Sequence, residues 1–351
     1  MAAETDYGTY SLEATLSGVR LVERPMDLKT SSFIRMDPPR HTEQRKTVAP
    51  AFTPSNLKNL EATIRQRTGA VLDGLPHGET FDWVTDVSVE LTTMMLATLF
   101  DFPWEDRHLL TYWSDVSIAE MESPDQIVRD EETRLAELDR MSDYFQDLFD
   151  ARAKTEPQFD LISLLAHNEA TRDMPRRELI GNVILLIVGG NDTKRNSMSG
   201  GVLAMHDNPA ENAKLRDNPA LVDRLVPEII RYQSSIIHMR RTALADSKLG
   251  GQKIAPGDKI AMWYVSGNWD DEVIENADQF IIDRGKPRRH SAFGAGVHRR
   301  LGDGLAELQL KVLWEEILGR HMEIEVVGKP ERLYSNFIRG ITALPTRIHA
   351  S

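Results

Sequence analysis

The sequence predicts a mainly helical fold with a small β component in its C-terminal third. Five long segments carry apolar residues three or four positions apart, the spacing that gathers them on one face of a helix. These segments are residues 57–75, 87–99, 130–155, 178–206 and 306–321. Short strand patterns, separated by turn residues, follow at residues 241–245, 253–254, 259–265 and 344–348.

Length and composition favour a single globular domain. The 351 residues can bury a large core, and no repeat or interdomain linker interrupts the pattern. We assign residues 31–351 to one domain. Residues 1–30 have weak apolar periodicity, and we expect them to form a poorly structured opening segment.

Charge and cysteine content exclude several classes of function. A net charge of −12 argues against general binding to nucleic acid or to an anionic membrane, because both need a basic surface. The longest apolar run, residues 183–190, is too short to span a bilayer, and no signal peptide is evident, so we expect a cytoplasmic protein. The chain has no cysteine, which excludes disulfide bonds and thiolate metal sites.

The first candidate site precedes the first long helix. His41 and Arg45 are four residues apart and therefore share one face of a helix that follows the turn at residues 37–39. Two cationic donors on one face indicate a contact with an anion. An exposed polar face is the competing interpretation, and the pattern alone does not separate the two.

Two adjacent glycines lie inside the long helix 178–206. Gly189 and Gly190 cost roughly 1 kcal/mol each relative to alanine in a helix interior, so a compensating role is expected. One interpretation is a local opening of the helix for a small ligand, with Asp192 and Thr193 relaying protons or holding a water beside it. The other is that the glycines permit close helix packing and that the two polar residues face solvent.

Charged residues in the C-terminal half supply further candidates. Glu228 and Arg231 lie on one helical face, where a surface pair would stabilise the helix by only about 0.2–0.5 kcal/mol. Arg241 begins a strand and either reaches an anionic ligand or forms a solvated basic pair with Arg240. Residues 284–300 hold six basic residues and no acidic one, which indicates either a solvated face or a docking surface for an acidic protein.

The most distinctive feature is the loop 293–302, which leads into the helix 306–321. Gly294, Gly296 and Gly302 let its backbone approach a flat ligand, and its amides can point at whatever lies beneath. A dinucleotide phosphate loop would need a preceding β-strand in a βαβ unit, and the sequence predicts none.

In their order and spacing these motifs resemble those of a bacterial cytochrome P450, a haem-thiolate monooxygenase. The resemblance runs from about Ser31 to the C-terminus, and residues 37–54, 189–203 and 262–268 are most similar to the soluble alkane and fatty-acid terminal hydroxylases. It implies a triangular, mainly helical fold, haem b and a small aliphatic substrate. It also implies electrons from a ferredoxin and an NADH-dependent ferredoxin reductase, with the basic residues 284–300 as the docking surface.

The resemblance also assigns roles to individual residues. The haem propionates would be held by His41, Arg45, Arg241 and His298, and the loop around the haem would include Phe293, Gly294 and Gly296. Asp192 and Thr193 would deliver protons to oxygen at the iron, and Glu228 and Arg231 would be structural. The substrate would be lined by Leu185, Val188, Gly189, Ile237 and Phe337.

Position 300 departs from the family pattern. Arg300 stands where the cysteine that ligates the iron belongs. A guanidinium has no lone pair to donate and stays protonated at physiological pH. Because the chain has no cysteine at all, we expect no intact metal site, no thiolate-ligated haem and no monooxygenase activity.

Other departures accompany Arg300. Lys194 follows the relay threonine, where relatives carry a small polar residue, and Gly304 adds a glycine to the first turn of the helix 306–321. The N-terminal helix and strands of the family have no counterpart before Ser31. We therefore expect a cytochrome P450 fold that lacks its N-terminal segment and exposes apolar surface.

Three interpretations of the function follow. The first is a monooxygenase lineage that has lost its activity, and the second is a non-catalytic family member that acts as a binding partner. The third is haem held by a different axial ligand, for which His298 is the nearest candidate, although its expected propionate contact points it away from the iron. The retained Asp192, Thr193 and Glu228 favour the first interpretation, because a redeployed scaffold does not need an oxygen-activating pair.

Overall fold

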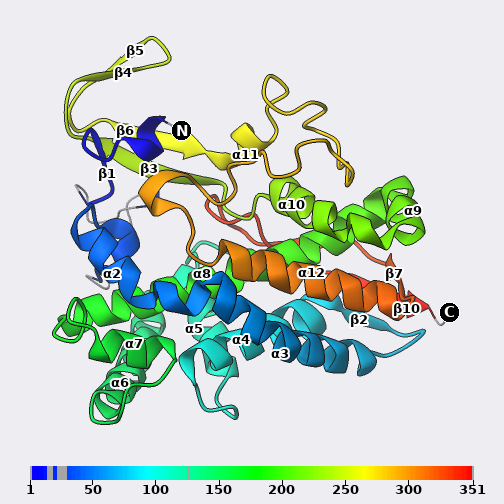
Figure 1. Cartoon of the computed structure of the whole chain (residues 1–351), viewed down its shortest axis with the longest axis horizontal. Helices are drawn as coiled ribbons and strands as arrows, with labels where there is room; N and C mark the ends of the chain where they lie inside the picture. The colour runs from blue at the N-terminus through cyan, green and yellow to red at the C-terminus, as the bar shows by residue number, and fades with distance from the viewer. Residues whose placement is uncertain (1, 14–18, 22–29, 125–126, 350–351) are drawn as a thin grey trace.

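The structure of the protein is a computed structural model that describes residues 2–13, 19–21, 30–124 and 127–349. Helices make up most of the described chain (Figure 1). They are α1 (Ala2–Thr5), α2 (Arg40–Val48), α3 (Pro54–Asp73), α4 (Glu90–Phe100), α5 (His108–Ile118), α6 (Glu131–Arg152), α7 (Leu161–His167), α8 (Arg176–Asp207), α9 (Pro209–Asp217), α10 (Val222–Gln233), α11 (Tyr264–Asn268) and α12 (Asp303–Gly319). In the described part of the chain, no helix is both long and apolar enough to cross a membrane.

The strands form small antiparallel sheets at the edges of the helical layers (Figure 1). In the first sheet β3 (His238–Ala243) lies between β1 (Tyr10–Ser11) and β6 (Lys259–Trp263). In the second, β10 (Pro345–His349) lies between β2 (Thr80–Asp82) and β7 (Glu323–Val326). The remaining pairs are β4 (Ser247–Leu249) with β5 (Gln252–Ile254), and β8 (Glu331–Arg332) with β9 (Ile341–Ala343).

The predicted mainly helical fold is confirmed, with element boundaries that differ by a few residues. The five predicted helices correspond to α3, α4, α6, α8 and α12, and the predicted strands to β3, β5, β6 and β10. The sequence did not predict α5, α7 and α9. Helices α7 and α9 have only 7 and 9 residues, which is too short for an apolar repeat to stand out from its surroundings.

The opening segment is more regular than predicted. Residues 2–13 include α1 and β1, and β1 pairs with β3 through Tyr10–Ala243 and Ser11–Thr242. The expectation of a poorly structured segment is therefore wrong for these residues. A two-residue strand gains its hydrogen bonds from a distant partner, which local periodicity cannot show. Residues 14–18 and 22–29 of this segment lie outside the described residues.

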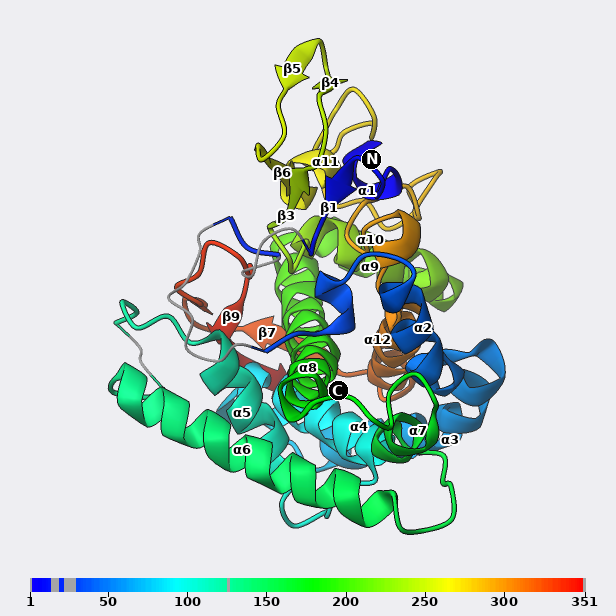
Figure 2. The same ribbon diagram turned by 90° about the vertical axis from the view of Figure 1, so that its left-hand side faces the viewer.

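Helix α8 joins the two halves of the hydrophobic core. Figure 2 shows it running through the middle of the molecule, with α5 and α6 on one side and α12 on the other. Val183 and Ile187 belong to a cluster with α4, α5, α6 and α7, whereas Met198 and Val202 belong to a cluster with α10 and α12. The segment 189–193 lies between these clusters, and this leaves space for a site beside the helix.

The two glycines of α8 have different surroundings. The helix is continuous through both, so the local opening considered from the sequence is not present. A Cβ on Gly190 would lie 2.7 Å from Cδ2 of Leu96 on α4, which explains a glycine there by close packing. A Cβ on Gly189 would meet nothing within 4 Å. Only one glycine of the pair is therefore required by helix packing.

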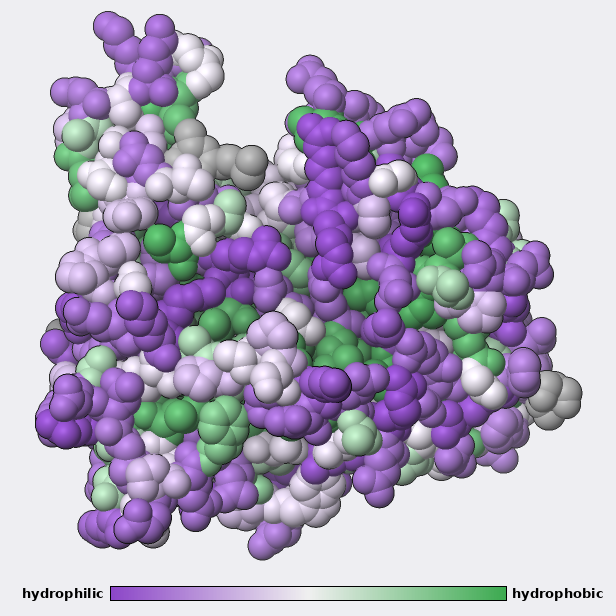
Figure 3. All heavy atoms as spheres, in the orientation of Figure 1, coloured by the Kyte–Doolittle hydropathy of each residue, from purple (hydrophilic) through white to green (hydrophobic). Residues whose placement is uncertain are grey.

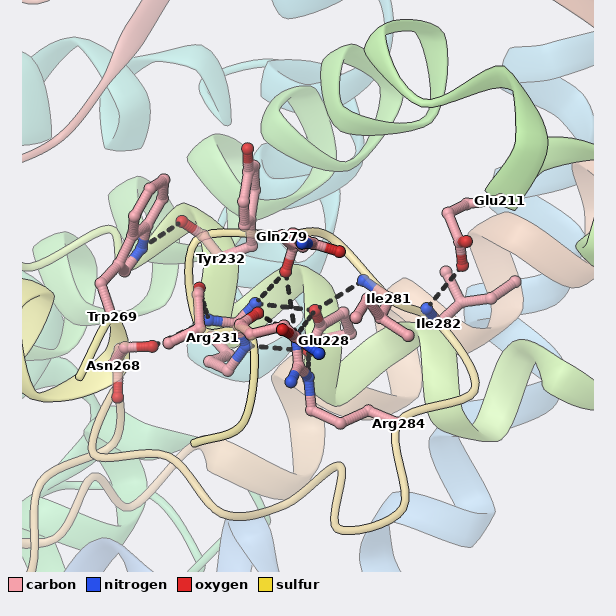
Figure 4. Close-up of polar contacts among 12 residues, drawn as sticks. Glu211, Glu228, Arg231, Tyr232, Asn268, Trp269, Gln279, Ile281, Ile282 and Arg284 are labelled. Atoms are coloured by element: carbon pink, nitrogen blue, oxygen red, sulfur yellow. Dashed lines mark hydrogen bonds and ion pairs between the residues drawn. The ribbon is translucent and has the colours of Figure 1, made fainter. Parts of the chain in front are cut away.

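Glu228 and Arg231 form a buried ion pair at the end of α10 (Figure 4). Nε and Nη2 of Arg231 donate to both carboxylate oxygens of Glu228, at 2.8 and 2.7 Å, and both side chains are fully buried. The other guanidinium hydrogens are donated to the carbonyl oxygens of Asn268, Ala277 and Gln279. Glu228 also accepts hydrogen bonds from Arg284 and from the main chain of Ile281. The network attaches the segment 268–284 to α10. This segment leads to the loop 293–302.

The substitution Glu228→Gln should lower the free energy of unfolding by about 3–5 kcal/mol, because it leaves buried guanidinium groups without a counter-charge. Urea unfolding followed by circular dichroism measures this. Glu137→Gln is the control, since it breaks the surface pair with Arg140, and it should cost less than about 1 kcal/mol. Equal losses in the two variants would show that the buried network does not stabilise the fold.

Two glycines of α8 provide a matched test of its packing. In Gly181→Ala the new methyl group would collide with the main chain of Ser31, and we expect a loss of about 1–3 kcal/mol in unfolding free energy. In Gly189→Ala the methyl group enters open space, and we expect a gain of up to about 1 kcal/mol from helix propensity. Thermal unfolding should shift in opposite directions for the two variants, and a common direction would contradict this packing.

Candidate functional site

A cavity of about 350 Å³ lies between α8, α2 and the loop 293–302. This volume is in the range of small-molecule sites in proteins. Its walls are mainly apolar, with Ile184, Leu185 and Val188 from α8, and Leu301 and Phe337 from the C-terminal third of the chain. A few charged and polar side chains interrupt these walls, and they determine which ligands the cavity can accept.

One end of the cavity carries two buried histidines. The rings of His41 on α2 and His298 on the loop are 4.3 Å apart, and the Nδ1 atom of each is buried without a hydrogen-bond partner among the described residues. Burial, with a contribution from the Arg45 charge, lowers the pKa of His41 to about 4 and that of His298 to about 3. Both rings are therefore neutral at pH 7 and able to donate a hydrogen bond to an anion.

Two arginines lie close to these histidines, Arg45 at the cavity wall and Arg241 near His298 outside the cavity lining. Arg241 on β3 is almost fully buried. Its Nη1 donates to the carbonyl oxygen of Arg240 at 2.9 Å, whereas its Nη2 has no partner in the part of the chain that the structure describes. Burial lowers the pKa of Arg241 and that of Arg45, with Asp303 opposing the shift at Arg45. Buried donors without partners are costly unless a ligand accepts from them.

This end of the cavity fits carboxylate groups. His41, Arg45, Arg241 and His298 are brought together from α2, β3 and the loop, as the resemblance implies for residues that contact haem propionates. The buried nitrogen atoms of His41, Arg241 and His298 that lack a partner among the described residues are suited to an anion with several acceptor oxygens. The propionate edge of a haem therefore matches the residues present.

The loop 293–302 is closed by its own main chain. The amide of Arg300 donates to the carbonyl oxygen of Phe293 at 2.9 Å, and Gly294 and Gly296 have φ angles of +70° and +65°. A Cβ on Gly296 would lie 2.5 Å from the carbonyl oxygen of Glu4, because α1 packs on this turn. The glycines are therefore explained by backbone conformation and by contact with α1. The sequence did not indicate this contact.

Arg300 lines the cavity at the position predicted for the iron ligand. Its guanidinium makes no hydrogen bond or ion pair with any residue that the structure describes. Burial lowers its pKa to about 10, and Tyr264 opposes this shift, so the group is still charged at pH 7. A cation without a lone pair cannot ligate iron. The residues present therefore fit the carboxylates of haem and do not fit its metal.

Asp192 and Thr193 are both at the cavity, next to Gly189. The Asp192 carboxylate is fully buried, accepts from Ser114 at 3.1 Å and pairs with Arg195 at 2.6 Å. Burial raises the pKa of Asp192 to about 6, and the Arg195 charge opposes this. The Thr193 hydroxyl donates to the carbonyl oxygen of Gly189 at 3.2 Å. The acid and the hydroxyl both line the cavity, and within the described residues each has a different hydrogen-bond partner.

Lys194 is a second cation at the cavity. The residue is 3% exposed, its Nζ atom has no hydrogen-bond partner within the described residues, and burial lowers its pKa to about 7. The sequence identified this residue only as a departure from the family pattern. Its position four residues after Gly190 on the same helix face was the indication that it would meet the cavity.

The residues predicted to contact the substrate line the cavity, with one exception. Leu185, Val188, Gly189 and Phe337 line the cavity, whereas Ile237 does not, and its neighbour Ile236 takes that place. The main chain of Ile237 donates to the carbonyl oxygen of Phe337 at 2.9 Å. Consecutive side chains of extended backbone point to opposite sides, so an error of one residue reverses the assignment.

The basic run 284–300 is partly neutralised by internal pairs. Arg284 binds Glu228, Arg288 pairs with Glu307, Arg299 pairs with Asp303, and Arg300 is inside the cavity. Lys286 and Arg289 are exposed, and no ion pair of theirs is seen within the described part of the chain. On the face shown in Figure 3, hydrophilic residues predominate and apolar residues form small separate groups.

Comparisons with known proteins give a consistent result. The family described as cytochrome P450 matches residues 125–342. Linalool 8-monooxygenase of Pseudomonas putida is 36% identical over 313 residues, which cover 89% of this chain and 76% of that protein. Methyl-branched lipid omega-hydroxylase of Mycobacterium tuberculosis is 32% identical over 321 residues, covering 90% of this chain and 74% of that protein.

Solved structures show the same similarity. Cytochrome P450-153 from Novosphingobium aromaticivorans is 44% identical, with a TM-score of 0.92, and the match covers 99% of this chain and 87% of that one. CYP153D17 from Sphingomonas sp. PAMC 26605 is 46% identical, with a TM-score of 0.90 and the same coverage of both chains. These structures confirm the predicted fold class.

The unpaired Lys194 should make stability depend on pH. In the folded protein the amine loses its proton near pH 7, whereas in the unfolded chain it keeps it up to about pH 10.5. Between these values the unfolded state binds more protons, so stability rises with pH. Relative to Lys194→Met, the wild type should therefore gain about 3 kcal/mol of unfolding free energy between pH 6.5 and pH 9.5.

Urea unfolding of both proteins at the two pH values measures this difference. Lys214→Met is the control, because Lys214 is half-exposed and paired with Glu211 and Asp283. The difference in unfolding free energy between the wild type and this variant should be nearly the same at both pH values. If the difference in unfolding free energy between the wild type and Lys194→Met also stays constant with pH, the amine is not held in an apolar environment.

Proposed function

The chain belongs to the cytochrome P450 family, and from that premise we propose that it is a cytochrome P450 with an aliphatic-substrate cavity whose monooxygenase activity is lost at Arg300. The observation that carries the proposal is the charged Arg300 side chain in the cavity, at the position where the family pattern has the iron-ligating cysteine. In this family, haem held by a cysteine thiolate supplies the oxygen-activating chemistry. Arg300 cannot hold it in that way.

Several observations support an aliphatic substrate. The cavity walls beside Thr193 are formed by Leu185, Val188 and Phe337, which offer no polar group to a ligand. The relatives include a linalool 8-monooxygenase and a methyl-branched lipid omega-hydroxylase, whose names indicate oxidation of aliphatic chains. We therefore assign the lineage to terminal hydroxylation of alkanes, fatty acids or similar chains.

Several residues other than Arg300 support this assignment of the lineage. His41, Arg45, Arg241 and His298 would bind the haem propionates, and the apolar wall would orient the chain of the substrate. Burial raises the pKa of Asp192 to about 6, so this carboxyl would exchange a proton close to neutral pH, and Thr193 would supply a hydroxyl at the same cavity. In an active form, electrons would come from a ferredoxin and an NADH-dependent ferredoxin reductase, docked on the exposed Lys286 and Arg289.

A second candidate is a non-catalytic family member that acts as a binding partner. It is favoured by the presence of two cations in the cavity, because Lys194 as well as Arg300 departs from the family pattern. Under this proposal, restoring the ligand alone would not restore the activity. The same experiment therefore separates the two candidates.

Arg300→Cys should recover oxygenase activity. The purified variant, loaded with haem and supplied with ferredoxin, ferredoxin reductase and NADH, should convert octane or dodecanoate to the terminal alcohol at a rate at least roughly 100-fold above the wild type. That factor is a lower bound, since replacing even an outer partner of a metal ligand changes activity by about 10–100-fold. Gas chromatography of the products measures it.

Arg299→Cys is the matched control, because it places the same thiol one residue away on an exposed side chain. It should be as inactive as the wild type. Turnover by the wild type would contradict the proposed loss of activity. If Arg300→Cys and the double variant Arg300→Cys/Lys194→Thr both stay inactive, the binding-partner function is favoured.

A further inference from the structure

Arg300 presents a charge to the cavity without a counter-ion. Its side chain lines the cavity and retains some accessible surface, yet burial lowers its pKa to about 10. Because the side chain lines the cavity, an anion in the cavity can reach it. An unpaired charge in such a place is costly, and an anion bound beside it would offset that cost.

The acidic residues of the cavity are already engaged elsewhere. Asp303 accepts hydrogen bonds from Arg299 at 2.8 Å and from the main chain of Gly304 at 2.7 Å. Asp192 is paired with Arg195 and accepts from Ser114. Within the described residues, neither carboxylate forms an ion pair with Arg300. The counter-ion that Arg300 lacks can therefore come from a ligand.

The surroundings of Arg300 determine the rest of that ligand. Leu301 and Leu305 follow it along the cavity wall, and Ile184, Leu185 and Val188 continue the apolar surface on α8. A ligand that matches both the Arg300 charge and the apolar wall has one anionic end and a long apolar chain. The planar fork of a guanidinium matches a carboxylate through two parallel hydrogen bonds, and a volume of about 350 Å³ is of the size that holds one small ligand.

We propose that this chain binds long-chain aliphatic carboxylates in its cavity without any metal, with the carboxylate on Arg300 and the chain along α8. In this arrangement Arg300 is a ligand anchor and the cavity is a fatty-acid binding site. The inference shares the apolar wall with the proposed function but does not depend on oxygenase chemistry. It concerns the wild-type chain free of haem and redox partners, so its failure would leave the proposed function untouched.

Isothermal titration calorimetry of the haem-free wild-type chain with dodecanoate and with 1-dodecanol tests the proposal. The two probes have the same chain length and differ in the head group. We expect dodecanoate to bind at least tenfold more tightly than the alcohol. Equal affinities, or no binding of dodecanoate, would overturn the proposal.

Variants of Arg300 test whether this side chain binds the carboxylate. Arg300→Met should lose at least tenfold in dodecanoate affinity while its dodecanol affinity stays within about twofold, which also shows that the variant is folded with its cavity intact. If Arg300→Met fails to fold, Arg300→Lys provides the second measurement, with dodecanoate binding weaker than in the wild type because the fork is lost. Unchanged dodecanoate affinity in either variant would overturn the assignment.

Two further variants test Arg289 and Lys194 as alternative anchors. Arg289→Met changes an exposed arginine of the same chain region and should bind dodecanoate like the wild type. Lys194→Met should also retain the preference for dodecanoate, because the carboxylate is placed on Arg300. A loss of preference in Lys194→Met with none in Arg300→Met would transfer the anchor to Lys194 and overturn the proposal as stated.

Discussion

The site depends on one constraint, which is that a guanidinium in an apolar cavity neither loses its charge nor donates an electron pair. Arg300 is placed by the main-chain closure of the loop 293–302, and that loop is attached through the segment 268–284 to the buried pair of Glu228 and Arg231. The position of residue 300 is therefore well determined by the fold. Only the chemistry of its side chain has changed.

Because of this constraint, the site can bind a ligand without oxidising it, whereas an intact site of this family would do both. The carboxylate-binding end, built from His41, Arg241 and His298, keeps buried donors that still lack partners. The acid and hydroxyl of Asp192 and Thr193 remain next to the cavity. Arg300 departs from the family pattern at the metal position, and Lys194 departs from it elsewhere in the cavity. A cavity with intact apolar walls, surplus positive charge and no metal ligand is suited to binding an amphipathic anion rather than to oxidising it.

The sequence identified most of the fold and the chemical groups of the site, but not how distant segments meet. The periodicity of α8 and the glycine pattern of the loop 293–302 are local properties, so both were predictable. The Ser114 hydroxyl that binds Asp192 and the contact of α1 with Gly296 come from segments far away in the chain. The choice between Ile236 and Ile237 depends on the phase of an extended segment, which the sequence does not reveal.

The central claim is that the fold of a haem-thiolate oxygenase is retained while thiolate ligation is not. The most direct measurement is the optical spectrum of the wild-type chain after addition of haem, reduction with dithionite and exposure to carbon monoxide. The account predicts no red-shifted Soret band of a thiolate–carbonmonoxy complex. A wild-type spectrum with that red-shifted band would contradict it.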